Sequence, residues 1–145
     1  MTTGATKYLG ARVPRKEDPR LLTGRGRYVA DLKLPGMLHV AFVRSEHAHA
    51  RIAGIEPAAA LALPGVVAVV TAADIAGQIR PIQGEARYEG FRSPDWPILA
   101  GDVVRYQGEP LAAVVAASRY LAEDAAEAVA VDYAPLPAVT DALAA

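Results

Sequence analysis

The three histidines are the first residues that could do chemistry, because imidazole is a common metal ligand. His47 and His49 lie two positions apart, so on a strand their side chains would share one face. A zinc site needs three or four ligands, and the others would have to be Glu46 or the distant His39. A turn and a strand that make ordinary hydrogen bonds explain these residues better. We therefore predict no metal site in this chain.

Other short motifs lack the context that their chemistry needs. The G-x-G pattern at 24–26 has no third glycine, no preceding strand and no following helix, all of which a dinucleotide site requires. Ser45 precedes His47 by two positions, but spacing alone does not make a nucleophile and its base, and no G-x-S-x-G turn is present. The same holds for Ser93 and Asp95. The sequence predicts no catalytic residue.

The segment 76–97 is a better candidate for function. It contains three glycines and three prolines, which predicts a long irregular loop. Loops of more than ~12–15 residues in a compact domain are usually functional or mobile. This one carries Tyr88, Phe91 and the only tryptophan, Trp96, together with several charged residues. Such a loop indicates a surface that meets another molecule, although a disordered insertion would explain the composition equally well.

Composition and charge limit the class of protein. A chain of 145 residues with 52% apolar residues fits one globular domain, and the lack of cysteine removes disulfides, thiolate zinc sites and iron–sulfur ligation. The sequence shows no export signal and no apolar run near the ~20 residues of a membrane helix, so a cytoplasmic location is expected.

The charge is divided unevenly along the chain. Residues 1–33 carry a net charge of +5 and residues 34–145 a net charge of −6. A basic arm of this kind can contact nucleic acid, or an acidic surface within its own assembly. The absence of interleaved aromatic residues disfavours nucleic acid. The candidate contacts with a partner are Arg15, Lys16, Arg25 and Arg27.

The pattern of apolar residues predicts the elements that must position these groups. Residues 1–20 lack periodicity and are expected to form an extended N-terminal arm, with the folded domain over 21–145. Helices are predicted at 57–63, opened by Pro57, and at 118–128, capped by Ser118, with Leu121, Ala125 and Ala128 on its inner face. Short strands are predicted at 28–29, 38–43, 51–56, 66–70, 98–99, 103–106, 111–116 and 129–132.

The order of these elements predicts the class of fold. We expect strand 38–43 to pair with strand 51–56, and a brief helical turn after Thr71, with Asp74 three positions on. Helices and strands are interspersed, so the fold class is α+β: a mixed sheet with two packed helices.

Three blocks in order give a more specific indication, and they cover nearly the whole chain: RKEDPRLLTGRGRYVADLKLPGMLHVAFVRSEHAHARI, LPGVVAVVTAADI and PILAGDVVRYQGEPLAAVVAASRYLAEDAAEAVAVDYAPLPAV. With them the chain resembles the N-terminal α/β-hammerhead domain of the molybdenum-cofactor-binding large subunit of the xanthine dehydrogenase, aldehyde oxidase and carbon monoxide dehydrogenase family. One departure is Glu46, where such sequences often have proline, and this should loosen one turn.

The resemblance implies an oxidoreductase that hydroxylates a substrate carbon with water, or oxidises carbon monoxide. Molybdopterin-bound molybdenum performs the reaction, and electrons leave through iron–sulfur clusters and often FAD. These groups belong to the remaining large-subunit domains, an iron–sulfur subunit or domain and, in many members, a flavoprotein subunit. The active-site glutamate lies in later domains, so this chain alone is expected to be inactive and to bind none of these cofactors.

The resemblance also gives the loop a role. In relatives, the loop before the segment 97–99 contributes to the funnel that leads to the molybdenum, so Tyr88, Phe91 and Trp96 become candidates to line a substrate channel. The alternative is a stand-alone interaction module whose basic arm binds an acidic partner or nucleic acid. A small hydrolase or metal enzyme is disfavoured by the poor set of nucleophiles and ligands.

Overall fold

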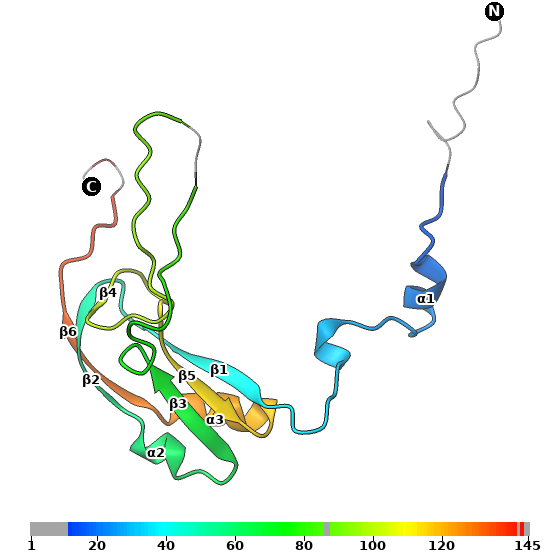
Figure 1. Ribbon diagram of the computed structural model, residues 1–145, viewed down its shortest axis with the longest axis horizontal. Helices are drawn as coiled ribbons and strands as arrows, with labels where there is room; N and C mark the ends of the chain where they lie inside the picture. Colours follow the sequence, from blue (N-terminus) through cyan, green and yellow to red (C-terminus); the bar gives the residue numbers. More distant parts are fainter. Residues whose placement is uncertain (1–11, 86–87, 142, 144–145) are drawn as a thin grey trace, which may run out of the picture. The chain divides into compact units, whose positions relative to one another are not determined.

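The structure is a computed structural model, and it describes residues 12–85, 88–141 and 143. The chain divides into two compact units, Met1–Pro35 and Gly36–Ala145. The described residues form ten helices and strands (Figure 1). The first unit contains α1 (Asp18–Leu22) and the 3-10 helix η1 (Val29–Asp31), and neither has a buried residue.

The helix α1 corrects part of the expected extended arm. Its first turn carries Pro19 at a position where proline is tolerated, and the hydroxyl of Thr23 donates to the Pro19 carbonyl at 2.6 Å. The predicted strand at 28–29 is also wrong, because the Asp31 carboxylate accepts from the Tyr28 amide at 2.9 Å and closes a single 3-10 turn there.

The second unit is built from two three-stranded sheets with short helices, which confirms the α+β class but replaces the one mixed sheet that the sequence predicted (Figure 1). One sheet has the order β1-β5-β3 and the other β4-β2-β6, and all their pairings are antiparallel. The elements are β1 (His39–Arg44), β2 (Ala50–Glu56), α2 (Ala58–Leu61), β3 (Val66–Thr71), β4 (Val103–Val104), β5 (Pro110–Ala116), α3 (Arg119–Glu127) and β6 (Ala130–Pro135).

The predicted pairing of the first two long strands is wrong. Strand β1 pairs with β5, whereas β2 pairs with β4 and β6 in the other sheet. The reason lies where β1 ends: the Ser45 amide donates to the Glu109 carbonyl at 3.0 Å, and the Gly108 amide donates to the Ser45 carbonyl at 2.8 Å. These bonds continue the β1–β5 pairing beyond Arg44 and hold the end of β1 beside the start of β5.

The predicted strand at 98–99 is also absent, and the apolar residues there are explained by burial. Leu99 and Ala100 are buried, and the Ala100 amide donates to the Pro110 carbonyl at 2.8 Å. Their apolar character therefore reflects burial in a turn rather than strand formation. The predicted turn after β3 is present, because the Asp74 carboxylate accepts from the Thr71 amide and hydroxyl, both at 2.7 Å. The described residues that follow it form further turns rather than the predicted helical turn.

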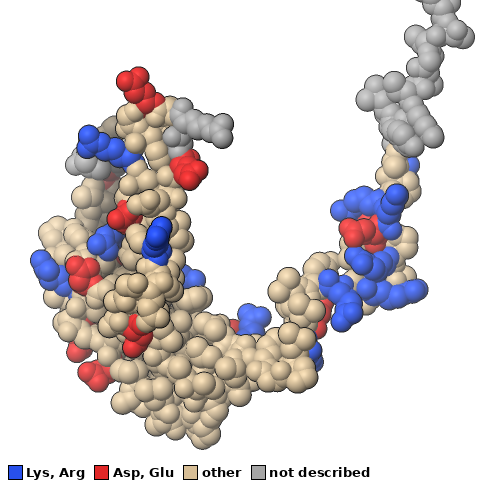
Figure 2. Space-filling view, in the orientation of Figure 1, with Lys and Arg blue, Asp and Glu red and all other residues tan. Residues whose placement is uncertain are grey.

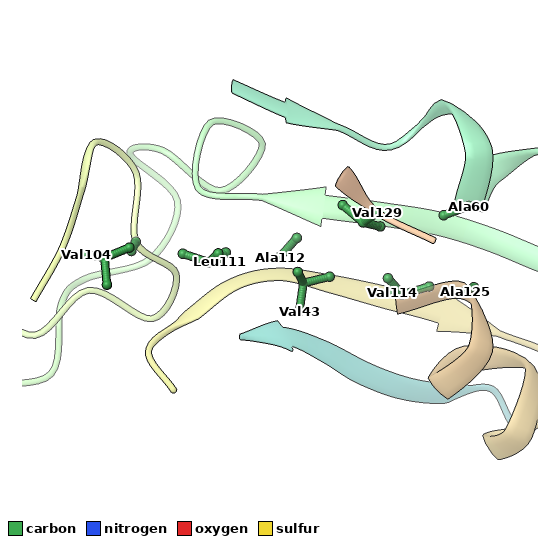
Figure 3. Close-up of a cluster of buried hydrophobic side chains, with 9 residues drawn as sticks. Val43, Ala60, Val104, Leu111, Ala112, Val114, Ala125 and Val129 are labelled. Atoms are coloured by element: carbon green, nitrogen blue, oxygen red, sulfur yellow. The ribbon is translucent and has the colours of Figure 1, made fainter. Parts of the chain in front are cut away.

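Small side chains dominate the core of the second unit. Figure 3 shows Val43, Leu111, Val114 and Val129 interleaved with alanines from α2, α3 and β5. The predicted cap of α3 is confirmed, since the Ser118 hydroxyl accepts from the Leu121 amide at 3.2 Å. The helix buries Ala122 and Ala125, while Leu121 and Ala128 are half-buried, so the predicted inner face was displaced by part of a turn. Alanine at these positions lets α3 lie close to β1 and β5.

Candidate functional site

The described part of the loop 76–97 is irregular, as predicted, and one isolated bridge joins its two arms at the base into an open hairpin. Ile82 and Trp96 form an antiparallel bridge, with amide–carbonyl bonds of 2.8 Å and 3.0 Å. Above this bridge the two arms of the hairpin project from the body of the second unit (Figure 1). The loop therefore has a defined base, formed where the arms meet the sheets.

Side chains tie the arms together beyond the bridge. The Gln83 amide nitrogen donates to the Asp95 carboxylate at 2.6 Å, and the Gly84 backbone amide donates to the Ser93 hydroxyl at 2.7 Å. Ser93 and Asp95 are thus engaged in structural hydrogen bonds, and we call these two bonds together with the Ile82–Trp96 bridge the ladder of the hairpin. The Ser93 hydroxyl also donates to the Pro94 carbonyl at 3.1 Å.

The three candidate channel residues occupy two levels of the hairpin. Tyr88 and Phe91 pack edge to face with ring centroids 5.3 Å apart, in the part of the loop above the ladder. Trp96 lies at the bridge, with 60% of its surface exposed. Tyr88 and Phe91 are also exposed. The structure thus brings two of the three rings into contact and leaves Trp96 apart from them.

Trp96 instead lines a hollow of about 520 Å³ at the base of the hairpin. Arg105 and Tyr106, from the bend that follows β4, and Glu109 also line this hollow. A neighbouring hollow of about 420 Å³ shares Pro97 and Arg105 and is lined largely by apolar residues of the turns after β3. Sequence reasoning missed these partners of Trp96 because they are close to it only in the folded chain.

A buried carboxylate organises this bend. Glu109 is only 3% exposed, and one of its oxygens accepts from the Arg105 amide at 2.5 Å. Its other oxygen is 3.9 Å from the Arg105 guanidinium, which also donates to the Val103 carbonyl at 2.9 Å. Gly108 takes a positive φ of 87°, which lets the bend close. In the sequence, this bend was indicated only by the Gly-Glu-Pro triplet at 108–110, which directly precedes an apolar strand.

His47 and His49 make structural contacts in the segment that directly follows β1. The hydroxyl of Ser45 accepts from the His47 amide at 3.0 Å and donates to the His47 carbonyl at 2.9 Å. The His47 ring packs on Tyr133 at 4.7 Å, and His49 Nδ1 is 2.7 Å from the Pro137 carbonyl. Burial raises the pKa of Tyr133, and its hydrogen bond to Ser45 offsets part of that rise. Over the described residues, no three His, Asp or Glu side chains are gathered closely enough to hold a metal ion.

The four basic candidates lie in the first unit and are exposed. Figure 2 shows lysine and arginine side chains gathered around α1, with few acidic ones between them. Arg15 donates to the Asp18 carboxylate at 2.9 Å, so part of its charge is neutralised locally. Lys16, Arg25 and Arg27 extend the same basic region. Separately, no helix in the described part of the chain is long and apolar enough to cross a membrane.

The buried Glu109 carboxylate leads to a prediction about stability. Glu109→Ala leaves the Arg105 amide without its acceptor, and we expect the free energy of unfolding to fall by about 1–3 kcal/mol. Glu109→Gln keeps an acceptor oxygen and should cost less. The exposed Glu56 at the end of β2 supplies the control, and Glu56→Ala should stay within about 0.5 kcal/mol of the parent. Urea unfolding measures all three, and equal losses for the two Glu109 variants would contradict this role.

Known proteins share both the sequence and the fold described above. The chain is 50% identical over 133 residues to the nicotine 6-hydroxylase large subunit of Paenarthrobacter nicotinovorans, covering 92% of this chain and 16% of that protein. It is 48% identical over 134 residues to the carbon monoxide dehydrogenase large chain of Afipia carboxidovorans, with the same two coverages. The structure of quinoline 2-oxidoreductase from Pseudomonas putida 86 matches with a TM-score of 0.85 at 55% identity, over 91% of this chain and 17% of that one.

These matches cover nearly the whole of this chain and a similar small share of each matched oxidoreductase. The chain spans about 16% of the length of the curated relatives that it matches. A family model described as the aldehyde oxidase and xanthine dehydrogenase a/b hammerhead domain covers residues 23–137, which is most of the chain. The chain therefore belongs to this hammerhead domain family of the molybdenum hydroxylases.

Proposed function

We propose that this chain is the N-terminal structural and substrate-channel domain of a molybdenum hydroxylase large subunit, and that it is not catalytic alone. The support is the extent of the similarity: relatives named as a hydroxylase and a carbon monoxide dehydrogenase match along 92% of this chain while extending far beyond it. In this proposal residues 1–20 are an arm, residues 21–145 are the hammerhead domain, and the full-length protein works in the cytoplasm.

The cofactors of such an enzyme do not fit the residues of this chain. Iron–sulfur clusters are held by cysteine thiolates, and the sequence contains no cysteine. The described His, Asp and Glu side chains do not gather into a metal-binding group. We assign molybdopterin-bound molybdenum to the remaining large-subunit domains, and the clusters and FAD to an iron–sulfur partner and a flavoprotein subunit.

The observation that carries the channel assignment is the hairpin at 76–97. Its arms are joined by the bridge at Trp96 and by two side-chain bonds, so its exposed rings have a defined support. Exposed aromatic rings beside an open hollow can guide a planar or apolar substrate by stacking and by excluding water. Trp96 would act at the base of this surface, and Tyr88 with Phe91 would act further along it.

This proposal makes a prediction about substrate selectivity. In the full-length enzyme, Trp96→Ala removes a ring whose contact with substrate contributes about 0.5–1.5 kcal/mol. We expect the ratio of kcat/KM for a larger and a smaller accepted substrate to change by about 3- to 10-fold. Tyr120→Ala, which removes an exposed ring on α3 away from the hairpin, serves as the matched control. An unchanged ratio in Trp96→Ala and in the Tyr88→Ala/Phe91→Ala variant would rule out the channel role.

A second candidate function rests on the exposed basic region of the first unit. It is a stand-alone interaction module in which Arg15, Lys16, Arg25 and Arg27 bind an acidic partner or nucleic acid. Four phosphate contacts would weaken the affinity for a DNA duplex by roughly 10²-fold between 50 and 200 mM salt. A mobility-shift titration over this range, repeated with all four residues changed to Gln, tests the idea. Absence of a shift at 50 mM salt, or a shift that survives the Gln variant, rejects it.

A further inference from the structure

A groove of about 440 Å³ runs beside β1, away from the hairpin. Four consecutive residues of β1, at positions 41–44, line it. Successive side chains of a strand point to opposite faces, so a groove that contacts all four residues is bounded by the strand's edge rather than by one face. Residues of α3 and β6, among them Val131, and Val129 between these two elements also line the groove.

The edge of β1 that faces this groove pairs with no described strand. In the order β1-β5-β3, strand β1 is terminal and β5 takes only one of its two edges. Free edges are templates for another strand, and proteins commonly protect them with lysine, proline or a covering segment. Strand β1 has no lysine or proline, and its Val40 and Phe42 side chains are about half exposed. The edge therefore has the properties of one that is covered in the working protein.

The charge of the groove indicates what covers it. Glu46, Glu123 and Glu127 line it, against a single cation, Arg44. Arg44 is already engaged, because its guanidinium donates to the Gly108 carbonyl at 2.9 Å. Glu123 has a local partner in Arg119 at 2.9 Å, whereas Glu46 and Glu127 form no ion pair with any residue that the structure describes. The groove thus combines apolar side chains with an excess of carboxylates, which suits an extended segment with alternating apolar and basic side chains.

The rest of the protein can supply such a segment. The chain corresponds to only 16% of the length of its relatives, so most of a full-length subunit lies outside these residues. We propose that the free edge of β1 binds an extended, basic segment from that outside part, which adds to the β1-β5-β3 sheet as a fourth strand. Backbone hydrogen bonds to β1 would give most of the affinity, and the carboxylates would select for basic side chains. This assignment of the bound segment rests on the proposed function, because the segment belongs to the rest of the large subunit.

Hydrogen exchange in the full-length protein tests this addition. We expect slow amide exchange throughout 39–44, because an added strand protects the outer edge as β5 protects the inner one. Glu127→Lys should speed exchange there by 10-fold or more. Asp124→Lys is the matched control, because Asp124 is exposed on the same helix but does not line the groove. Fast exchange in the parent, or equal rates in the two variants, would overturn the proposal.

A photo-crosslink identifies the segment itself. With p-benzoyl-phenylalanine in place of Phe42 in the full-length protein, irradiation should join β1 to a residue beyond 145 of the same polypeptide. A crosslink within residues 1–145, or to a second copy, would overturn the assigned occupant, and so would the absence of any crosslink. The molybdenum content of the same preparation reports separately on the proposed function, so a metal-free protein with a protected β1 would refute that function alone.

Discussion

The burial of β5 is the constraint on which the rest of the second unit depends. Leu111, Ala112, Val114 and Ala116 on this strand are buried, and β5 is the only strand of its sheet with a neighbour on both sides. The segments directly before and after β5 in the chain are therefore held in place at its two ends. The Glu109 bend precedes it and the Ser118 cap follows it, so one strand positions both the base of the hairpin hollow and the helix α3.

The same strand explains why the two surfaces of interest lie at different places. The bend before β5 places Arg105 and Tyr106 beside Trp96, where the hollow forms. On the other side, β5 pairs with β1 and leaves the outer edge of β1 beside the acidic residues of α3. The proposed channel surface and the proposed docking surface therefore both follow from how the strands are ordered.

The sequence predicted the local features well, because they depend on nearby residues. The strand at 66–70 follows from its β-branched residues, and the start of α3 from the Ser118 hydroxyl. The pairing of β1 could not be predicted, because it is decided by Ser45 and Glu109, which are far apart in the sequence. Trp96 was found as the only tryptophan, but Arg105, Tyr106 and Glu109 carry no local pattern that links them to it. The family resemblance, which depends on the order of whole blocks, is confirmed.

The central claim is that this domain belongs to a molybdenum enzyme whose metal is held by other parts of the protein. Elemental analysis of two purified samples, the 145-residue chain and the product of the complete coding sequence with its partner subunits, tests it most directly. We expect close to one molybdenum per large subunit in the complete protein and none in the 145-residue chain. Stoichiometric molybdenum in the 145-residue chain, or none in a complete protein produced with a functional cofactor supply, would contradict it.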